Sequence, residues 1–358
     1  MKVYNRLEQK IRGGMIMDYT YQEILRQPDT WRETLHYLQE KESYCAQFLN
    51  EKHDNVIFTG CGSSYNLSLS ASHLWQAGKQ VPARGVPSSE TFLFPQGVFL
   101  PQNHYLIFGI SRSGETTETV KALQHFQDKF KGKTIGVSCE ENSSLLKTAD
   151  YQVALPFARE ESVVMTQSFS SMLLSFLFLS CSPSKSTSNL SSLPEILEKH
   201  LPAGEKAIKD LASDLSFDKF IFLGDGPYHG IAWEGSLKLK EMSVTSTETF
   251  HFLEFRHGPK SVVDEKTLII ALTSQKAFSW EKEVILEMID LGATILHLGK
   301  SPLHSPRTTE ITFPEETLDD FSLPVLYLPF LQLLGYYRAK NKGLNPDSPR
   351  HLTKVVKI

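Results

Sequence analysis

One sequence pattern occurs twice in this chain and constrains its fold more than any other feature. An apolar run that ends in Gly-x-Gly stands at residues 56–62 (VIFTGCG) and again at residues 220–226 (FIFLGDG), and a helix-forming stretch follows each copy. A short apolar run, a glycine turn and a helix form the start of a β-α unit in a parallel sheet. The repeat spacing of about 164 residues therefore predicts two α/β domains of one kind.

Short apolar runs alternate with helix-length segments along the rest of the chain. Strands are expected at residues 55–59, 81–86, 104–111, 134–139, 151–155, 219–223, 267–272, 293–298 and 310–313. Helices are expected at residues 65–77, 115–130, 143–149, 166–179, 194–211, 228–242, 280–291 and 325–342. Because helix-length crossovers separate the strands, the chain is predicted to be α/β, with parallel sheets covered by helices on both faces.

A polar, serine-rich segment at residues 180–192 is the best candidate for a linker between the two halves. The predicted division is an N-terminal arm and helix at 1–34, a first domain at 35–190, a second domain at 191–345 and a C-terminal tail at 346–358. Residues 1–14 match nothing later in the chain and are interpreted as an arm or a misassigned start.

Charge and composition exclude several classes of function. The formal net charge is −4, so the chain has no basic field for a nucleic acid. The longest apolar stretches are shorter than a membrane span, and residues 1–20 lack a signal peptide. The four cysteines show no CxxC pairing and no metal-ligand spacing with histidine, so we expect no metal site and a cytoplasmic location.

The strongest candidate for ligand binding is the loop at residues 111–116 (SRSGET), hereafter the hydroxyl loop. Ser111, Ser113 and Thr116 surround a glycine directly after a predicted strand, where the next helix begins. Hydroxyl groups and helix N-terminal amides are suitable donors to a phosphate, and Arg112 adds a positive charge. The alternative is that Ser113 only caps the helix, since Ser113 and Thr116 have cap-box spacing without a Glu at the last position. Three hydroxyls and an arginine exceed what capping requires, which favours phosphate.

A second candidate is the turn at residues 60–65 (GCGSSY), whose glycines allow close approach of the backbone to a ligand. By itself this motif is equally consistent with a simple tight turn. No Gly-x-x-x-x-Gly-Lys-[Ser/Thr] motif is present, so a nucleotide P-loop is excluded. There is also no complete Gly-x-Gly-x-x-Gly with a following acidic residue, which argues against a dinucleotide.

Acid–base chemistry is suggested by one helix face in the second half. Glu234, Lys238 and Glu241 stand at positions i, i+4 and i+7, so they share one side of a helix. The alternative is an ordinary solvated stripe of charges. The loop that follows contains His257 between Arg256 and a Gly-Pro pair, a setting that suits a proton carrier better than a core residue.

Taken together, these motifs resemble the sugar isomerase (SIS) family. The likeness covers roughly residues 20–358 and is to double-domain members: tagatose-6-phosphate ketose/aldose isomerases, amino-sugar-6-phosphate deaminases and the isomerase half of glucosamine-6-phosphate synthase. The motifs that show it are the hydroxyl loop, the GCGSSY turn, residues 234–241 (EGSLKLKE) and residues 255–261 (FRHGPKS). The resemblance implies two tandem SIS domains, each an α-β-α sandwich with a flavodoxin-like parallel sheet.

The resemblance also implies roles for matching residues. The 6-phosphate would be bound by five residues, namely Ser64, Ser111, Arg112, Ser113 and Thr116. The sugar would be approached by five others, namely Gly62, Val164, Thr166, Glu234 and Lys238.

Three further residues match catalytic positions of the family. Glu241 would be the base that moves a proton between C1 and C2, and His257 would open the sugar ring. In the synthase that histidine comes from a neighbouring subunit, which implies a homodimer or higher homo-oligomer with shared active sites. Lys354 matches the C-terminal lysine of the synthase, whose loop closes over the sugar. No cofactor is expected.

The features of two subgroups are mixed in this chain. Residues 21–28, Arg112 and residues 255–261 resemble the tagatose isomerase and deaminase group, whereas residues 238–241 and the tail at 349–354 resemble the synthase. No glutaminase domain with an N-terminal cysteine is present, so glutamine-dependent amination is not expected.

The function predicted from the sequence is aldose–ketose isomerisation of an amino-sugar 6-phosphate with release of ammonia. Glucosamine or galactosamine 6-phosphate would give the ketose 6-phosphate. Two alternatives stay open at this point: a fructosamine-6-phosphate deglycase, and a sugar-phosphate sensor that binds without turnover.

Overall fold

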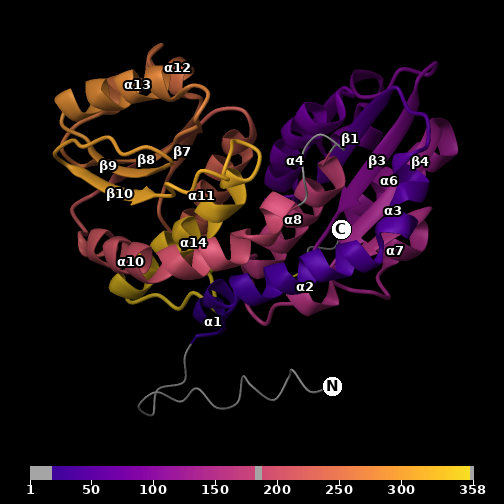
Figure 1. Cartoon of the computed structure of the whole chain (residues 1–358), viewed down its shortest axis with the longest axis horizontal. Coiled ribbons are helices and arrows are strands. Elements are labelled where there is room, and N and C mark those ends of the chain that lie inside the picture. The colour runs from indigo at the N-terminus through magenta and orange to yellow at the C-terminus, as the bar shows by residue number, and fades with distance from the viewer. Residues whose placement is uncertain (1–17, 182–187, 355–358) are drawn as a thin grey trace.

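The computed structural model describes residues 18–181 and 188–354, in which two parallel five-stranded sheets have helices on both faces (Figure 1). The first sheet contains β1 (Asn55–Gly60), β2 (Ala83–Pro87), β3 (His104–Ile110), β4 (Lys131–Ser138) and β5 (Tyr151–Ala154). The second contains β6 (Lys219–Gly224), β7 (Glu248–Phe250), β8 (Thr267–Leu272), β9 (Thr294–Gly299) and β10 (Thr308–Thr312). The predicted α/β class is confirmed.

The helices alternate with these strands as the apolar periodicity predicts. Those of the first half are α1 (Tyr19–Leu25), α2 (Gln27–Glu40), α3 (Glu42–Leu49), α4 (Ser63–Lys79), α5 (Glu90–Leu93), α6 (Thr117–Lys129), α7 (Ser144–Thr148) and α8 (Gln167–Ser180), with short 3-10 turns η2 (Pro95–Gly97) and η3 (Pro156–Ala158). Those of the second half are α9 (Ser188–Ser191), α10 (Leu193–Ser213), α11 (Pro227–Ser243), α12 (Phe252–Phe255), α13 (Phe278–Asp290) and α14 (Leu323–Asn341), with η4 (Pro259–Val262).

The two sheets have the same strand order. The first runs β2-β1-β3-β4-β5, and the second, taken from its opposite edge, runs β7-β6-β8-β9-β10. All pairs in both sheets are parallel. In each half the repeated Gly-x-Gly turn follows the strand at which the order reverses, where open α/β sheets bind their ligands.

One apolar core joins the two halves. In β1, Phe58 faces this shared core together with Phe222 of β6, whereas the alternate residues Ile57 and Ile221 face separate outer clusters under α6 and under α12 and α13. This alternation follows from the two-residue period of a strand. The helices α4, α8, α11 and α14 lie between the two sheets and carry the shared core (Figure 1).

The N-terminal helix α2 is hydrogen-bonded to helices of both halves, which the sequence did not predict. On α2, the indole of Trp31 donates to Ser170 Oγ of α8 at 2.9 Å, and Gln27 Nε2 donates to Gln332 Oε1 of α14 at 2.8 Å. The predicted boundary between residues 34 and 35 lies inside this single helix. The division into domains at 1–34, 35–190, 191–345 and 346–358 stays a proposal.

Some predictions lie partly outside the described residues. These are the arm at 1–14, the middle of the linker at 180–192 and the last four residues of the tail. Within the described ranges, the short elements β7, α5 and α12 had no apolar periodicity long enough to predict them. No helix in this part of the chain combines the length and apolarity that crossing a membrane requires.

The helices α4 and α11 cross closely between the halves. They run antiparallel: Ser70 of α4 donates from its Oγ to the carbonyl of Pro227 at 2.7 Å, while Ser63 at the start of α4 meets the later turns of α11. Gly230 makes this approach possible, because a Cβ there would lie 2.4 Å from both the carbonyl oxygen of Asn66 and the Oγ of Ser70.

Replacement of Gly230 by Ala should therefore destabilise the protein, even though alanine is the better helix former by about 1 kcal/mol. We expect a loss of about 1–3 kcal/mol in the free energy of unfolding, because α4 and α11 must move apart. Urea denaturation measures it. The control is Gly97→Ala, where nothing lies within 4 Å of the added Cβ. Equal stability of the two variants would contradict the close packing.

Candidate active site

The two predicted ligand turns open at the same edge of the first sheet. Strands β1 and β3 are parallel neighbours with Thr59 paired to Gly109, so their carboxyl ends stand side by side. Neighbouring strands are about 4.8 Å apart. The Gly-x-Gly turn after β1 therefore lies next to the hydroxyl loop after β3.

The hydroxyl loop gathers its three side chains as predicted. Ser111 Oγ lies 2.9 Å from Thr116 Oγ1 and 3.5 Å from Ser113 Oγ, and it accepts a hydrogen bond from the Gly114 amide at 3.0 Å. Gly114 has φ of +63°, and a Cβ there would lie 2.1 Å from Ser143 Oγ. A left-handed conformation and lack of space both require glycine at this position.

The capping alternative for this loop is not supported. Helix α6 begins at Thr117, its N-cap is Thr116, and no side chain caps it. Ser113 Oγ instead accepts from the amide of Glu115 at 3.2 Å, inside the loop. The hydroxyls therefore shape the loop itself, and no side chain covers the start of α6 as a cap.

The turn after β1 supplies the start of α4. Gly62 is the N-cap, with φ of 56° and ψ of −125°, and no side chain caps this helix either. Ser63 and Ser64, the first two residues of α4, are both buried. The turn thus presents a helix N-terminus and small hydroxyl residues next to the hydroxyl loop.

The charged face of α11 is buried, so the solvated-stripe alternative is wrong. Glu234 and Lys238 are both 0% exposed. Lys238 Nζ lies 3.2 Å from Glu234 Oε1 and pairs closely with Glu241 Oε2. The Glu241 side chain is 18% exposed, so of the two carboxylates it is the one that a ligand can reach.

Residues of α4 complete this cluster from the other half of the chain. Ser63 Oγ donates to Glu234 Oε1 at 2.9 Å and lies 3.1 Å from Lys238 Nζ, and Asn66 Nδ2 donates to Glu234 Oε2 at 3.1 Å. Ser63 adjoins Ser64 of the glycine turn, so the charged cluster and the phosphate candidates meet at the start of α4.

Burial raises the pKa of Glu234 to about 7; Lys238 opposes this shift and Glu241 adds to it. Lys238 has a raised pKa, because the two carboxylates outweigh its burial. Two carboxylates share one ammonium group here, so the cluster would have a net negative charge if both were ionised. Partial protonation of the deeper one, Glu234, relieves that repulsion.

Arg112 makes its contacts with residues outside its own loop. Its guanidinium forms an ion pair with Glu160 (Nη1 to Oε2, 2.9 Å) and donates to the carbonyls of Val163 at 2.8 Å and Val164 at 3.3 Å. Nη2 of Arg112 also donates to the carbonyl of Lys354 at 3.3 Å.

The structure also places the other predicted sugar-binding residues and the tail at this loop. Thr166 is buried and donates from its backbone amide to Glu160 Oε1 at 2.6 Å. Lys354 Nζ donates to the Glu160 carbonyl at 3.1 Å and lies 3.5 Å from Glu161 Oε2. Val164, Thr166 and Lys354 are thus brought together beside Arg112.

His257 is not brought to the rest of the site within one chain. It lies between α12 and η4, its side chain is exposed, and no hydrogen bond or ion pair joins that side chain to another described residue. Gly258, the next residue, has φ of 111°, which explains the glycine in the His-Gly-Pro motif.

The equivalent loop of the second sheet, residues 273–277 after β8, is already occupied by carboxylates of the chain. Asp320 accepts from the amides of Gln275 at 2.6 Å and Lys276 at 2.9 Å. Glu281 accepts from the amide of Ser274 at 2.8 Å and from its hydroxyl at 2.9 Å. The donors that would bind an external anion are used internally.

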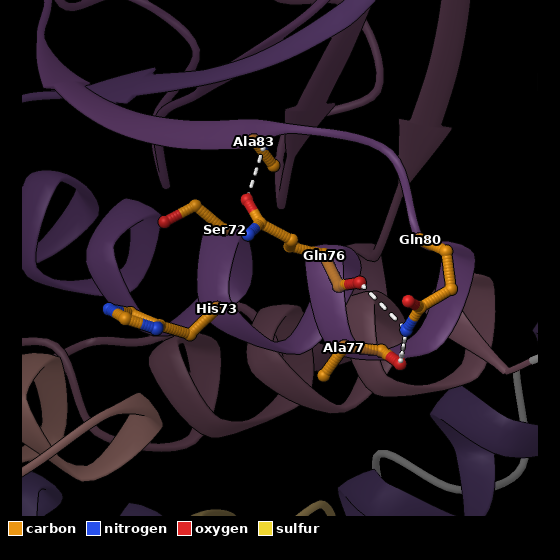
Figure 2. A pocket seen from close by; sticks show the side chains of 6 residues that line it. All are labelled: Ser72, His73, Gln76, Ala77, Gln80 and Ala83. Atoms are coloured by element: carbon orange, nitrogen blue, oxygen red, sulfur yellow. Dashed lines mark hydrogen bonds between the residues drawn. The ribbon is translucent and has the colours of Figure 1, made fainter.

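The helix α4 is the counterpart of α11, 164 residues earlier, with a glycine N-cap and a left-handed C-cap in both. The positions that match Glu234, Lys238 and Glu241 on α4 are Ser70, Leu74 and Ala77. Figure 2 shows the pocket of about 360 Å³ at that end of α4, which is lined by Ser72, His73, Gln76, Ala77, Gln80 and Ala83. It has no carboxylate, so it lacks the acid–base set of α11.

Comparison with known proteins supports the assignment that these motifs suggested. The family model for the SIS domain matches residues 48–181. Glucosamine-6-phosphate deaminase from Thermotoga maritima is 32% identical in sequence to this chain. Its crystal structure superposes with a TM-score of 0.80, and the match covers 94% of this chain and 99% of the deaminase.

The chain belongs to the SIS family.

Two further SIS proteins extend the comparison. The tagatose-6-phosphate ketose/aldose isomerase of Escherichia coli shares the fold, with a TM-score of 0.85 over 92% of this chain and 94% of its own, at 21% identity. The glutamine–fructose-6-phosphate aminotransferase of Buchnera aphidicola is 28% identical over 95% of this chain, which spans 57% of that relative's length. These named relatives are enzymes, as the sequence predicted for this chain.

Three residues of the site were missed by the sequence analysis. Ser63 and Asn66 fall on one face of α4, and their spacing would have indicated that they act together. Glu160 stands in a loop without periodicity, so nothing in the sequence indicated its contacts. Within the described ranges, no group of three or more His, Cys, Asp or Glu residues is arranged to bind a metal ion.

The raised pKa of Glu234 predicts a pH-dependent contribution to stability. The folded state binds a proton at Glu234 more tightly than the unfolded chain, whose pKa is near 4.5, so stability from this group is lost as the pH rises from there through about 7. The stability of wild type relative to Glu234→Gln should fall over this range, by on the order of 3 kcal/mol.

Urea unfolding of both proteins at several pH values measures this difference. The control is Glu283→Gln, which changes an exposed carboxylate on α13. A difference between wild type and Glu234→Gln that does not vary with pH would contradict the shift.

Proposed function

We propose that this chain is a phosphosugar isomerase and deaminase that converts an amino-sugar 6-phosphate, glucosamine or galactosamine 6-phosphate, to the ketose 6-phosphate and ammonia. The observation that supports this most is the meeting of two groups at the start of α4. Ser63, which follows the Gly-x-Gly turn as the first residue of α4, contacts the charged cluster of α11, and the hydroxyl loop lies beside that turn.

The phosphate would be bound by the hydroxyl loop and the start of α4. Ser111, Ser113 and Thr116 offer hydroxyls, Ser64 is the second residue of α4, and the helices α4 and α6 both begin without a side-chain cap. A phosphate monoester at two helix N-termini is favoured by their dipoles. The sugar would extend from there towards Gly62 and the cluster on α11.

Glu241 is the proposed base. One of its oxygens pairs with Lys238, and the other has no partner among the described residues. Lys238, held in turn by Glu234 and Ser63, fixes the carboxylate in place. Such positioning against C1 and C2 is worth several kcal/mol of the barrier.

The proposed reaction is redox-neutral and needs no cofactor. Glu241 removes the proton at C2 of the open-chain amino sugar and returns it to C1. The C1 carbonyl oxygen gains a proton and becomes a hydroxyl, while the C2 amine loses one and becomes an imine. Water then hydrolyses the imine to the ketose and ammonia. For a substrate with a hydroxyl at C2 the same proton shift is a simple aldose–ketose isomerisation.

His257 is proposed to open the sugar ring in a neighbouring subunit. Its exposed position, without a contact to Glu241 among the described residues, agrees with a role in the site of a second copy. The active unit would then be a homodimer or a larger homo-oligomer. Lys354 is proposed to close the tail over the sugar at residues 160–166.

Glu241→Gln should abolish turnover while sugar-phosphate binding is nearly retained. The amide keeps the shape and a hydrogen bond to Lys238 but cannot take a proton, and general-base catalysis is worth about 10²–10⁴-fold. Ammonia release and isomerisation of glucosamine, galactosamine and fructoselysine 6-phosphate would be followed, with binding measured by calorimetry.

The same assay separates the alternatives. Lysine release from fructoselysine 6-phosphate alone would indicate a deglycase, and binding of a sugar phosphate without any turnover would indicate a sensor. Glu283→Gln, on the far side of the second sheet from α11, should behave as wild type. Turnover of Glu241→Gln within about tenfold of wild type would refute its role as the base.

His257→Ala should lose more activity on a closed-ring substrate than on one that is already open. An open-chain sugar phosphate does not need ring opening, so loss of the ring-opening residue should not slow its conversion. Rates on glucosamine 6-phosphate would be compared with those on a 4,5-dideoxy analogue, which lacks both ring-forming hydroxyls and stays open. An equal loss on both substrates would contradict the role.

A further inference from the structure

Glu160 lies at the centre of the loop between β5 and α8 and has no role in the predicted site. It is completely buried, at 0% side-chain exposure. Its two oxygens accept five hydrogen bonds, which fill the acceptor sites of a carboxylate. The donors are Arg112 Nη1 at 2.9 Å, the Thr166 amide at 2.6 Å and hydroxyl at 3.0 Å, and the Ser168 amide at 2.9 Å and hydroxyl at 2.7 Å.

These contacts give Glu160 two structural tasks. Thr166 is the N-cap of α8 and Ser168 lies in its first turn, so the carboxylate occupies the N-terminus of that helix, where a negative charge is favoured. The same carboxylate pairs with Arg112, which lies in the hydroxyl loop. One buried group therefore connects α8, the segment 162–166 and the hydroxyl loop.

The partners of Arg112 are protein oxygens outside its own loop, and none of them is one of the three hydroxyls. Both terminal nitrogens of the guanidinium bind protein oxygens: Glu160 and the carbonyls of residues 162–164, with the Lys354 carbonyl at 3.3 Å. The side chain is 13% exposed. Because protein oxygens already accept from both of its terminal nitrogens, this guanidinium has few N–H groups left to donate to a phosphate.

A second carboxylate fixes the other side of the same segment. Glu23 of α1 accepts from the amides of Glu161 at 2.5 Å and Ser162 at 3.3 Å, and it also binds the Ser162 hydroxyl. The segment that contains Val164 is thus held between α1 and Arg112 by contacts within the chain.

We propose that Glu160 and Arg112 act as one positioning pair, which sets the sugar-facing segment 162–166 and the Lys354 tail against the hydroxyl loop and leaves the phosphate to the hydroxyls and helix amides. This inference rests on the proposed function. It assigns Arg112 to the placement of the sugar and the tail in place of its predicted contact with phosphate. Neither residue of the pair touches the reacting atoms.

Three variants test the pair: Arg112→Gln, Glu160→Gln and the double variant. Turnover of glucosamine 6-phosphate should fall by about tenfold to a hundredfold in each single variant, because a displacement of about 1 Å has such an effect. Affinity for inorganic phosphate, measured by calorimetry, should change by less than about threefold. The double variant should be no slower than the slower single variant, because coupled residues are not additive.

The matched control is Glu140→Gln. Glu140 Oε2 pairs with Arg159 Nη2 at 2.5 Å in the same region, but both side chains are 45% exposed. Exposed ion pairs contribute little, so this variant should keep turnover within about twofold of wild type. If a single variant does not fold, the double variant still tests the pair, because it leaves no buried charge without a partner.

Hydrogen exchange gives a readout that does not depend on turnover. In Glu160→Gln, amide exchange should accelerate at residues 160–168 and 350–354 but not in the α4 and α11 helices. Absence of turnover by the wild-type protein would refute the proposed function and leave this test intact. Loss of phosphate affinity by tenfold or more in Arg112→Gln alone, or unchanged exchange in Glu160→Gln, would overturn the positioning pair.

Discussion

The buried junction between α4 and α11 is the interaction on which the rest of this structure depends. Ser63 of one half binds Glu234 and Lys238 of the other at 2.9 and 3.1 Å, and both of these charged residues are completely buried. Buried charges are tolerated only when they are paired and hydrogen-bonded, so while α4 covers this face Lys238 needs its two carboxylates and Glu234 needs the donors of Ser63 and Asn66. The junction thereby fixes the phosphate candidates relative to the carboxylate of Glu241.

Much of this organisation could be predicted from the sequence. The repeated strand and Gly-x-Gly turn indicated two similar sheets, because strand periodicity and glycine conformation are local properties of the chain. The shared face of Glu234, Lys238 and Glu241 followed from helix geometry. Its burial did not, because burial depends on which helix of the other half covers that face.

The unpredicted parts share a physical cause. Glu160 and Arg112 are 48 residues apart and meet through the order of strands β3, β4 and β5, which no local pattern encodes. A loop arginine beside three hydroxyls suggested a phosphate ligand, because the sequence shows neighbours along the chain and not the partners of a side chain. The helices α1 and α2 were missed as connectors for the same reason.

The equivalent helices α4 and α11 cross antiparallel, so the two ends of the junction have similar backbones and differ in their side chains. The start of α4 meets the later turns of α11, and the start of α11 meets the later turns of α4, so the duplication offers two similar places for a site. At the second place Pro227 and Tyr228 replace the two serines, and Asp225 replaces Cys61 in the turn. A proline has no N–H and an aspartate repels an anion, and in the loop 273–277 Asp320 already takes the amides. Among the described residues, the proposed anion donors and the charged set of α11 therefore occur together at one end of the junction.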